Sequence, residues 1–361
     1  MCLNELVSSS IPLPSRRLPA LDGLRFVAAL AVVIFHFTAS PYGLGWSIPA
    51  PQGFSRLAQF TVYGAMGVQL FFVVSGFVIL MSAWGRTIPQ FVGSRVGRIF
   101  PAYIFAVLLT GVLYPIIIGG EVNLPKVLMN LTMLQQPFGV QLVDGVYWTM
   151  WVEICFYVLI GIVLLRGITV GRVTALVAFW PLVAILIRNV DTRAADFFQP
   201  LFAPLFAAGM GLYLIYAFGH SLLRWALVAF NAVMAAHLTS GTWMRWTSES
   251  VGVRQDPLVS YFVVIGLIAL VAVCVLTPLR QVGGKYATLA GSLTYPLYLT
   301  HVYWGLLVVG LVEPALGKWG ALVVAIAAVV AFAYVIVRYV ERPLGPKLRR
   351  NIESALSREI K

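Results

Sequence analysis

The chain has 361 residues, of which 60% are hydrophobic and only 11% are charged, and its mean hydropathy is +0.90. A soluble chain of this length carries about a quarter charged residues, so the composition excludes a soluble globular protein and indicates an integral membrane protein. The net charge of +12 is expected from basic cytoplasmic loops, and it is poor evidence for nucleic-acid binding.

Long apolar segments follow one another along the whole chain, each with enough residues to cross a membrane as a helix. Continuous apolar runs favour helices over a β-barrel, whose strands would alternate in hydrophobicity. We predict an all-α, polytopic membrane bundle of about ten transmembrane helices, with one domain over 1–343 and a short basic cytoplasmic tail over 344–361. The predicted segments are 21–40, 60–82, 99–118, 145–165, 173–190, 200–217, 222–241, 258–279, 289–312 and 319–340.

The distribution of basic residues predicts how the chain is oriented. Most of the 25 lysines and arginines fall on one side when the segments alternate, which predicts that both termini are cytoplasmic. Residues 1–15 lack the pattern of a cleavable signal peptide, so we expect the first segment to be retained. The three cysteines are scattered and indicate neither a disulfide framework nor a metal site.

The first segment carries Arg25 and His36, eleven positions apart. At 100° per residue these positions return to within about 20° of one face, with about 16 Å between them along the helix axis. A cation would then lie near the cytoplasmic surface and an imidazole in the outer half of the membrane. An ionisable group at that depth costs free energy unless something satisfies or uses it. His36 is therefore either a packing histidine with one hydrogen bond or a catalytic base.

Two further groups of polar residues need an explanation. Arg95 and Arg98 lie three positions apart on one helical face, where they form either a positive-inside anchor or, together with Arg25, a cradle for phosphate groups. Glu153 lies about 12 Å inside its segment, counted from Gly145. An acid at that depth needs a partner, water or a proton, so Glu153 orients a base, accepts a proton, contacts the substrate or forms a structural hydrogen bond.

The ninth segment contains GSLTYPLYLTHVYWG, in which Tyr295, Tyr298 and His301 recur every three residues and lie on neighbouring faces. His301 reaches the outer half of the membrane, at a depth compatible with that of His36. An aromatic belt at the interface explains Tyr303 well, but Tyr295 is too deep for it.

Taken together, these residues resemble the membrane-bound acyltransferase 3 family. Each matching piece is weak alone, but their order along nearly the whole chain, from about residue 18 to 343, is specific. The pieces are Arg25 with His36, FFVVSGF (71–77), RVGR (95–98), WTMWVE (148–153), SLTYPLYLTH (292–301) and Glu341-Arg342-Pro343.

The resemblance implies a ten-helix integral membrane enzyme that takes an acyl group from cytoplasmic acyl-CoA, with acetyl-CoA as the usual donor. Such enzymes modify hydroxyls of surface polysaccharides, lipid-linked glycans or other sugars, and some acylate antibiotics. By this resemblance His36 is the essential base, and Arg25, Arg95 and Arg98 belong to the donor site. Many O-antigen acetylases of the family also carry an SGNH hydrolase-like domain, which we expect this chain to lack.

The sequence thus predicts an O-acyltransferase of the bacterial inner membrane whose partners are acyl-CoA, a carbohydrate or glycoside acceptor and membrane lipid, with no metal and no nucleic acid. We expect His36 to deprotonate an acceptor hydroxyl that attacks the thioester directly; an acyl-histidine intermediate is the alternative. A small-molecule glycoside or antibiotic acceptor, and a proton-coupled transporter, are the alternative functions. The candidate catalytic residues are His36 and Glu153, and the candidate substrate-binding or supporting residues are Tyr295, Tyr298, His301 and Trp148.

Overall fold

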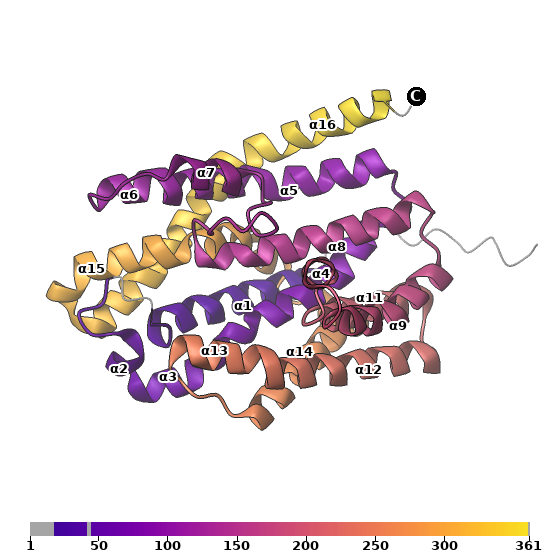
Figure 1. Cartoon of the computed structure of the whole chain (residues 1–361), viewed down its shortest axis with the longest axis horizontal. Helices are drawn as coiled ribbons and strands as arrows, with labels where there is room; N and C mark the ends of the chain where they lie inside the picture. The colour runs from indigo at the N-terminus through magenta and orange to yellow at the C-terminus, as the bar shows by residue number, and fades with distance from the viewer. Residues whose placement is uncertain (1–17, 42–44, 360–361) are drawn as a thin grey trace, which may run out of the picture.

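The computed structural model describes residues 18–41 and 45–359, and it confirms the all-α membrane bundle (Figure 1). The stretch expected to lack a signal peptide, 1–15, lies outside these residues. No β-strand occurs in the described part of the chain. The helices are α1 (Pro19–Thr38), α2 (Ala50–Gly53), α3 (Ser55–Thr61), η1 (Val62–Met66), α4 (Gly67–Ala83), α5 (Ile88–Leu108), η2 (Leu109–Leu113), α6 (Tyr114–Ile117), α7 (Leu124–Leu131), η3 (Gly145–Tyr147), α8 (Trp148–Leu165), α9 (Val170–Ile187), α10 (Thr192–Phe198), α11 (Ala203–Phe218), α12 (Leu222–Leu238), η4 (Thr239–Trp243), α13 (Met244–Val251), α14 (Pro257–Leu276), η5 (Pro278–Gln281), α15 (Gly284–Ile336), η6 (Val337–Glu341) and α16 (Arg342–Glu359).

Within the described residues, 9 helical stretches are long and apolar enough to cross a membrane. The last of them, Gly284–Glu359, contains both the ninth and the tenth predicted segments. These two segments are separated at Gly317, whose φ of 66° and ψ of 174° break the helix inside α15. Because glycine adopts positive φ without a steric penalty, the chain can reverse there with no intervening loop.

The third membrane helix begins earlier than its hydrophobicity predicts. The predicted segment starts at residue 99, whereas α5 starts at Ile88. Thr87 is its N-cap, and the backbone N–H of Thr87 donates to Gln90 Oε1 at 3.1 Å. This reciprocal cap starts the helix in a polar stretch. Arg95 and Arg98 therefore lie well inside α5 instead of at its first turn.

Helix α1 packs against the first half of α15, and both run in the same direction. Two glycines of α15 allow this close approach. A Cβ added at Gly291 would lie 2.5 Å from Asp22 Cβ, and one at Gly305 would lie 2.2 Å from Phe37 Cζ. Glycine at these two levels brings the backbones together and fixes the register of the two helices. As a consequence, His36 and His301 lie at the same depth in the bundle.

The last helix, α16, turns back along α5 (Figure 1, top). It is polar and mostly exposed on its outer side, while Gly345 is buried against α5. The chain between 344 and 359 therefore forms a helix that is held against the bundle.

Candidate functional site

A cavity of about 800 Å³ lies at the end of the bundle that contains the C-terminal end of α1. Its walls come from α1, α4, α8, α13 and α15, and from the connection that precedes α8. Large aromatic side chains form much of its surface, and none of the described residues that line it is Asp, Glu, Lys or Arg. Ligand sites of about 300–1,000 Å³ with mostly apolar walls are typical of small-molecule binding. The aromatic and imidazole side chains that line it include Phe35, His36, Trp148, Trp243, Trp246 and Tyr298.

The two histidines predicted at similar depth meet at the edge of this cavity. His301 is fully buried, and its Nε2 atom lies 3.0 Å from Nδ1 of His36. The His36 ring is half-buried and lines the cavity. The centres of the two rings are 4.8 Å apart. The pair therefore connects a buried imidazole to one that reaches a ligand-sized space.

Backbone carbonyls determine which nitrogen of each neutral ring carries the proton. Nδ1 of His301 lies 2.9 Å from the carbonyl oxygen of Tyr298 and 3.2 Å from that of Leu297. Because a carbonyl oxygen only accepts, His301 Nδ1 is the donor and its Nε2 is an acceptor. Nδ1 of His36 faces that acceptor and also the carbonyl oxygen of Val32, at 2.9 Å. His36 Nδ1 therefore carries the proton, and the lone pair of the neutral ring is on Nε2.

Tyr298 lies between the large cavity and a second, narrower one of about 50 Å³. Its hydroxyl donates to the carbonyl oxygen of Val146 and accepts from Thr149 Oγ1, each at 3.2 Å. Val68 and Tyr298 line both cavities, so the two spaces share a wall. Trp148, at the first turn of α8, lines the large cavity and packs against Phe202 at 5.2 Å between ring centres.

The narrow cavity extends from this shared wall to Arg25 and Glu153. Tyr295 also lines it, and its hydroxyl donates to the backbone carbonyl of Ile99 at 3.1 Å. Arg25 thus lies at one end of a space whose other end approaches His36. The helical spacing places Arg25 and His36 about 16 Å apart along α1, and each lines one of the two adjoining cavities.

Glu153 belongs to the Arg25 end of the path. It lines the narrow cavity and accepts a hydrogen bond from the hydroxyl of Tyr157 one turn later on α8. The guanidinium of Arg95 lies over the Tyr157 ring, 5.7 Å from its centre. His36 forms its side-chain hydrogen bond with His301, while Glu153 lines the narrow cavity and not the large one.

Arg98 lies near Arg25 and the carboxylate of Glu341. The charges of Arg25 and Arg98 both act on Glu341, a carboxylate of η6. One Glu341 oxygen is buried without a hydrogen-bond partner among the described atoms. The three predicted arginines therefore lie at the same end of the bundle, but Arg25 and Arg98 share Glu341 while Arg95 contacts Tyr157.

Several lining residues were not singled out from the sequence. Trp243 and Trp246 lie after the predicted end of the seventh segment, 222–241, but the helix continues there through η4 into α13. Two tryptophans three positions apart lie on one helical face, and that spacing is the signal that could have marked them. Tyr157 lies four positions after Glu153 on α8, so helical spacing alone could have indicated that the two side chains are neighbours. Within the described residues, no group of three or more His, Cys, Asp or Glu side chains could hold a metal ion.

Comparison with known proteins identifies a family and a relative that the chain resembles. A family model described as an acyltransferase domain, that of the acyltransferase 3 family, matches residues 18–338. The chain is 30% identical over 150 residues to acyltransferase MdmB of Streptomyces mycarofaciens, and the aligned part is 39% of this chain and 38% of that relative. The match therefore spans well under half of the relative's length. No solved structure matches the chain. Since the family model covers nearly the whole chain, the protein is a member of the acyltransferase 3 family.

Proposed function

We propose that the protein is an O-acyltransferase that moves an acyl group, normally acetyl, from cytoplasmic acyl-CoA to a hydroxyl of a carbohydrate acceptor at the outer side of the bacterial inner membrane. The observation that carries this proposal is the path of two adjoining cavities, with Arg25 at one end and His36 at the other. An acyl-CoA molecule has the matching shape, because its phosphates are joined to the reactive sulfur by a long, thin arm.

The donor enters from the arginine end in this proposal. Guanidinium groups bind phosphate oxygens through charge-assisted hydrogen bonds, which suits Arg25, Arg95 and Arg98 for the nucleotide end of CoA. The pantetheine arm occupies the narrow cavity, past Glu153 and Tyr295. Its thioester then reaches the shared wall at Tyr298, beside the large cavity.

The acceptor occupies the large cavity, and its reacting hydroxyl lies against His36. Nε2 of His36 removes the hydroxyl proton while the oxygen attacks the thioester carbonyl. The tetrahedral intermediate collapses, the carbon–sulfur bond breaks, and the thiolate of CoA takes the proton from the imidazolium. General-base assistance of this kind contributes about 10²–10⁴-fold to the rate. His301 supports the step, because its Nε2 accepts from the protonated Nδ1 of His36 throughout.

The acceptor class follows from the walls of the large cavity. Aromatic surfaces stack on the apolar faces of sugar rings, and the lack of charged side chains among the described lining residues favours a neutral acceptor. A neutral sugar of a surface polysaccharide or lipid-linked glycan fits this chemistry. The bounded volume of about 800 Å³ also supports the second candidate, a small-molecule glycoside or antibiotic. Membership of the acyltransferase family favours either of these over a proton-coupled transporter.

The test is thiol release from acetyl-CoA by the purified, reconstituted protein, with a cell-envelope glycan extract as the acceptor. We expect release that requires the acceptor and is lost in His36→Ala, while the variant still binds CoA. Unchanged release by His36→Ala would overturn the role of the histidine. A stable acyl group on His36 in the absence of acceptor would replace direct transfer with a two-stage mechanism.

A further inference from the structure

A further group of charged residues lies where α16 packs on α5. The family model matches residues 18–338, so it includes α5 but not α16. Its geometry depends on the G-x-x-x-G pattern of Gly93 and Gly97 on α5. A Cβ added at Gly93 would lie 2.4 Å from Glu353 Cγ, and one at Gly97 would lie 2.8 Å from Arg349 Cβ. Only glycine at both positions lets Glu353 and Arg349 of α16 lie this close to α5.

Positive charge exceeds negative charge in this group. The charges of Arg95, Arg349 and Glu353 all act on Arg86, which lies in the turn before α5. Partial burial and the two neighbouring guanidinium groups lower the pKa of Arg86, so its positive charge is poorly compensated. Arg349 Nε pairs with Glu353 Oε1 at 2.7 Å, and this is the one carboxylate in contact with the group among the described residues. Three guanidinium groups thus face a single carboxylate.

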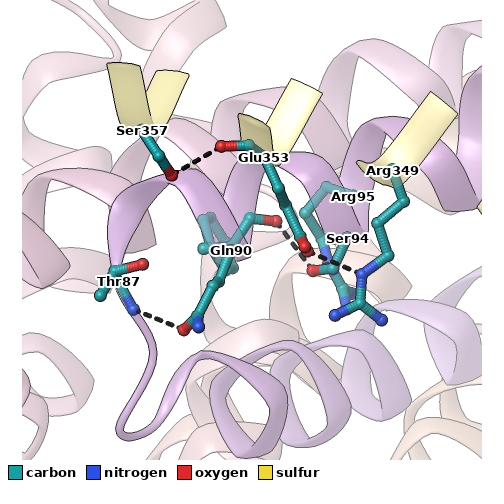
Figure 2. A network of polar contacts seen from close by, with 8 residues as sticks. Thr87, Gln90, Ser94, Arg95, Arg349, Glu353 and Ser357 are labelled. Carbon is teal, nitrogen blue, oxygen red and sulfur yellow. Dashed lines mark hydrogen bonds and ion pairs between the residues drawn. The ribbon is translucent and has the colours of Figure 1, made fainter. Parts of the chain in front are cut away.

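The side chains of Glu353 and Arg349 extend from α16 toward α5, where Ser94 and Arg95 lie (Figure 2). Arg95 Nε donates to Ser94 Oγ at 3.3 Å. The Arg349 side chain remains 46% exposed, so an anion from solution can reach it. These are the features of a site for phosphate groups.

We propose that Arg86, Arg95 and Arg349 bind the phosphate groups at the nucleotide end of CoA, and that Glu353 holds Arg349 in position and competes with the phosphate for it. This assignment rests on the proposed function. Arg95 links the group to the donor path, because it also lies over Tyr157, which donates to Glu153 in the narrow cavity. The nucleotide would lie against the exposed side of this group, beside the contact of α5 and α16, and its arm would run toward Arg25. A phosphate of an anionic lipid headgroup has the same chemistry and is the other source of such a ligand.

The experiment measures binding of CoA and of 3′-dephospho-CoA to the full-length protein in nanodiscs of neutral phosphatidylcholine by calorimetry. We expect Arg349→Gln and Arg86→Gln each to weaken CoA binding about tenfold, as expected for one charge-assisted contact, and to reduce the preference for CoA over its dephospho form. Glu353→Gln should have the opposite effect and tighten CoA binding. Arg358→Gln is the matched control, since nine positions along α16 place it on the opposite face from Arg349.

Three results overturn the proposal in different ways. CoA binding that is unchanged in Arg349→Gln and Glu353→Gln, with both variants eluting as the wild type on size exclusion, removes α16 from the donor site. A repeat in nanodiscs containing phosphatidylglycerol addresses the lipid source: stabilisation by that lipid that is lost in Arg349→Gln, with CoA binding intact, assigns the group to the membrane. Absence of CoA binding by the wild type contradicts the proposed function itself.

Discussion

His36 and His301 are 265 positions apart in the sequence, and their rings form a direct hydrogen bond of 3.0 Å between Nδ1 and Nε2. The bond has a direction, because backbone carbonyls of α15 hold the proton of His301 on Nδ1. His301 can therefore receive the hydrogen bond from His36 but cannot donate one through Nε2 while it is neutral. A positive charge that forms on His36 would be shared with a buried, uncharged partner.

Replacement of His301 tests this positioning role. We expect His301→Ala to lower kcat for acyl transfer by about 10²-fold with little change in the KM for acetyl-CoA, because the variant removes the acceptor for His36 Nδ1 and leaves the donor path intact. His301→Gln should recover part of the loss, since its amide oxygen can still accept that proton. Steady-state kinetics of the three proteins provides the measurement. Equal losses in Ala and Gln, or a loss confined to KM, would contradict the role.

Much of this architecture could be predicted from the sequence, because membrane segments are continuous apolar runs. The ninth and tenth segments were found even though α15 joins them at Gly317 without a loop. The start of α5 was missed by about three turns, because the cap at Thr87 and Gln90 lies in a polar stretch that a hydrophobicity criterion excludes. The continuation of the seventh segment through η4 into α13 was missed for the same reason.

The candidate site was predicted less completely than the fold. Helical spacing places Arg25 and His36 on one face, and it places His301 at a compatible depth. It cannot show that the two histidines touch, since that depends on how Gly291 and Gly305 set the register between α1 and α15. Nor does spacing show that Arg95 of α5 lies over the Tyr157 ring of α8, because which helices are neighbours in a bundle is not determined by any one of them.

The narrow cavity provides a second test, because any side chain that fills it should block the donor arm. Ser75 lines this cavity and is a small residue. We expect Ser75→Leu to lower kcat/KM for acetyl-CoA by about a hundredfold, since small displacements of a reacting group cost about that much. Ser82→Leu is the control: Ser82 lies two turns further along α4, bonds to its own helix and lines neither cavity. Similar activity in the two leucine variants would show that the donor does not use this route.

Asp144, just before α8, should make stability depend on pH. The residue is buried, and burial raises the pKa of its carboxyl from 3.8 to about 7. Oδ1 accepts from the backbone N–H of Val146, while Oδ2 has no hydrogen-bond partner among the described atoms. Because the folded state holds this proton more tightly than the unfolded state, its contribution to stability is complete below about pH 4. It is lost as the pH rises to about 7, by on the order of a few kcal/mol.

The measurement compares thermal unfolding of the wild type and Asp144→Asn in detergent between pH 4 and 9. The amide keeps the hydrogen bond to Val146 but does not titrate. We expect the two proteins to have similar melting temperatures at pH 4 and the variant to be the more stable above pH 7. Because other carboxylates titrate equally in both, the difference isolates Asp144. A difference that does not vary with pH would mean that Asp144 is ionised throughout.

The aromatic wall of the large cavity should determine how well the acceptor binds. Trp246 lines the cavity from α13, and 58% of its surface is exposed. We expect Trp246→Ala to raise the KM for the acceptor about tenfold and Trp246→Phe to raise it less, with the affinity for CoA unchanged in both. Trp225→Ala is the control, because Trp225 lies in the first turn of α12, contacts His220 and lines neither cavity. If the variant changed the affinity for CoA as much as the KM for the acceptor, the cause would be unfolding of α13 and not loss of an acceptor contact.

The narrowness of the inner cavity has a consequence for the membrane itself. At about 50 Å³ it has room for only a few water molecules, and it shares a wall with a much larger space of about 800 Å³. A wide, water-filled passage through a bundle of this kind would conduct protons and small ions and discharge the gradient that powers the cell. In the proposed function, a narrow space filled by the pantetheine arm would let an acyl group pass from one side to the other while the bilayer stays electrically sealed.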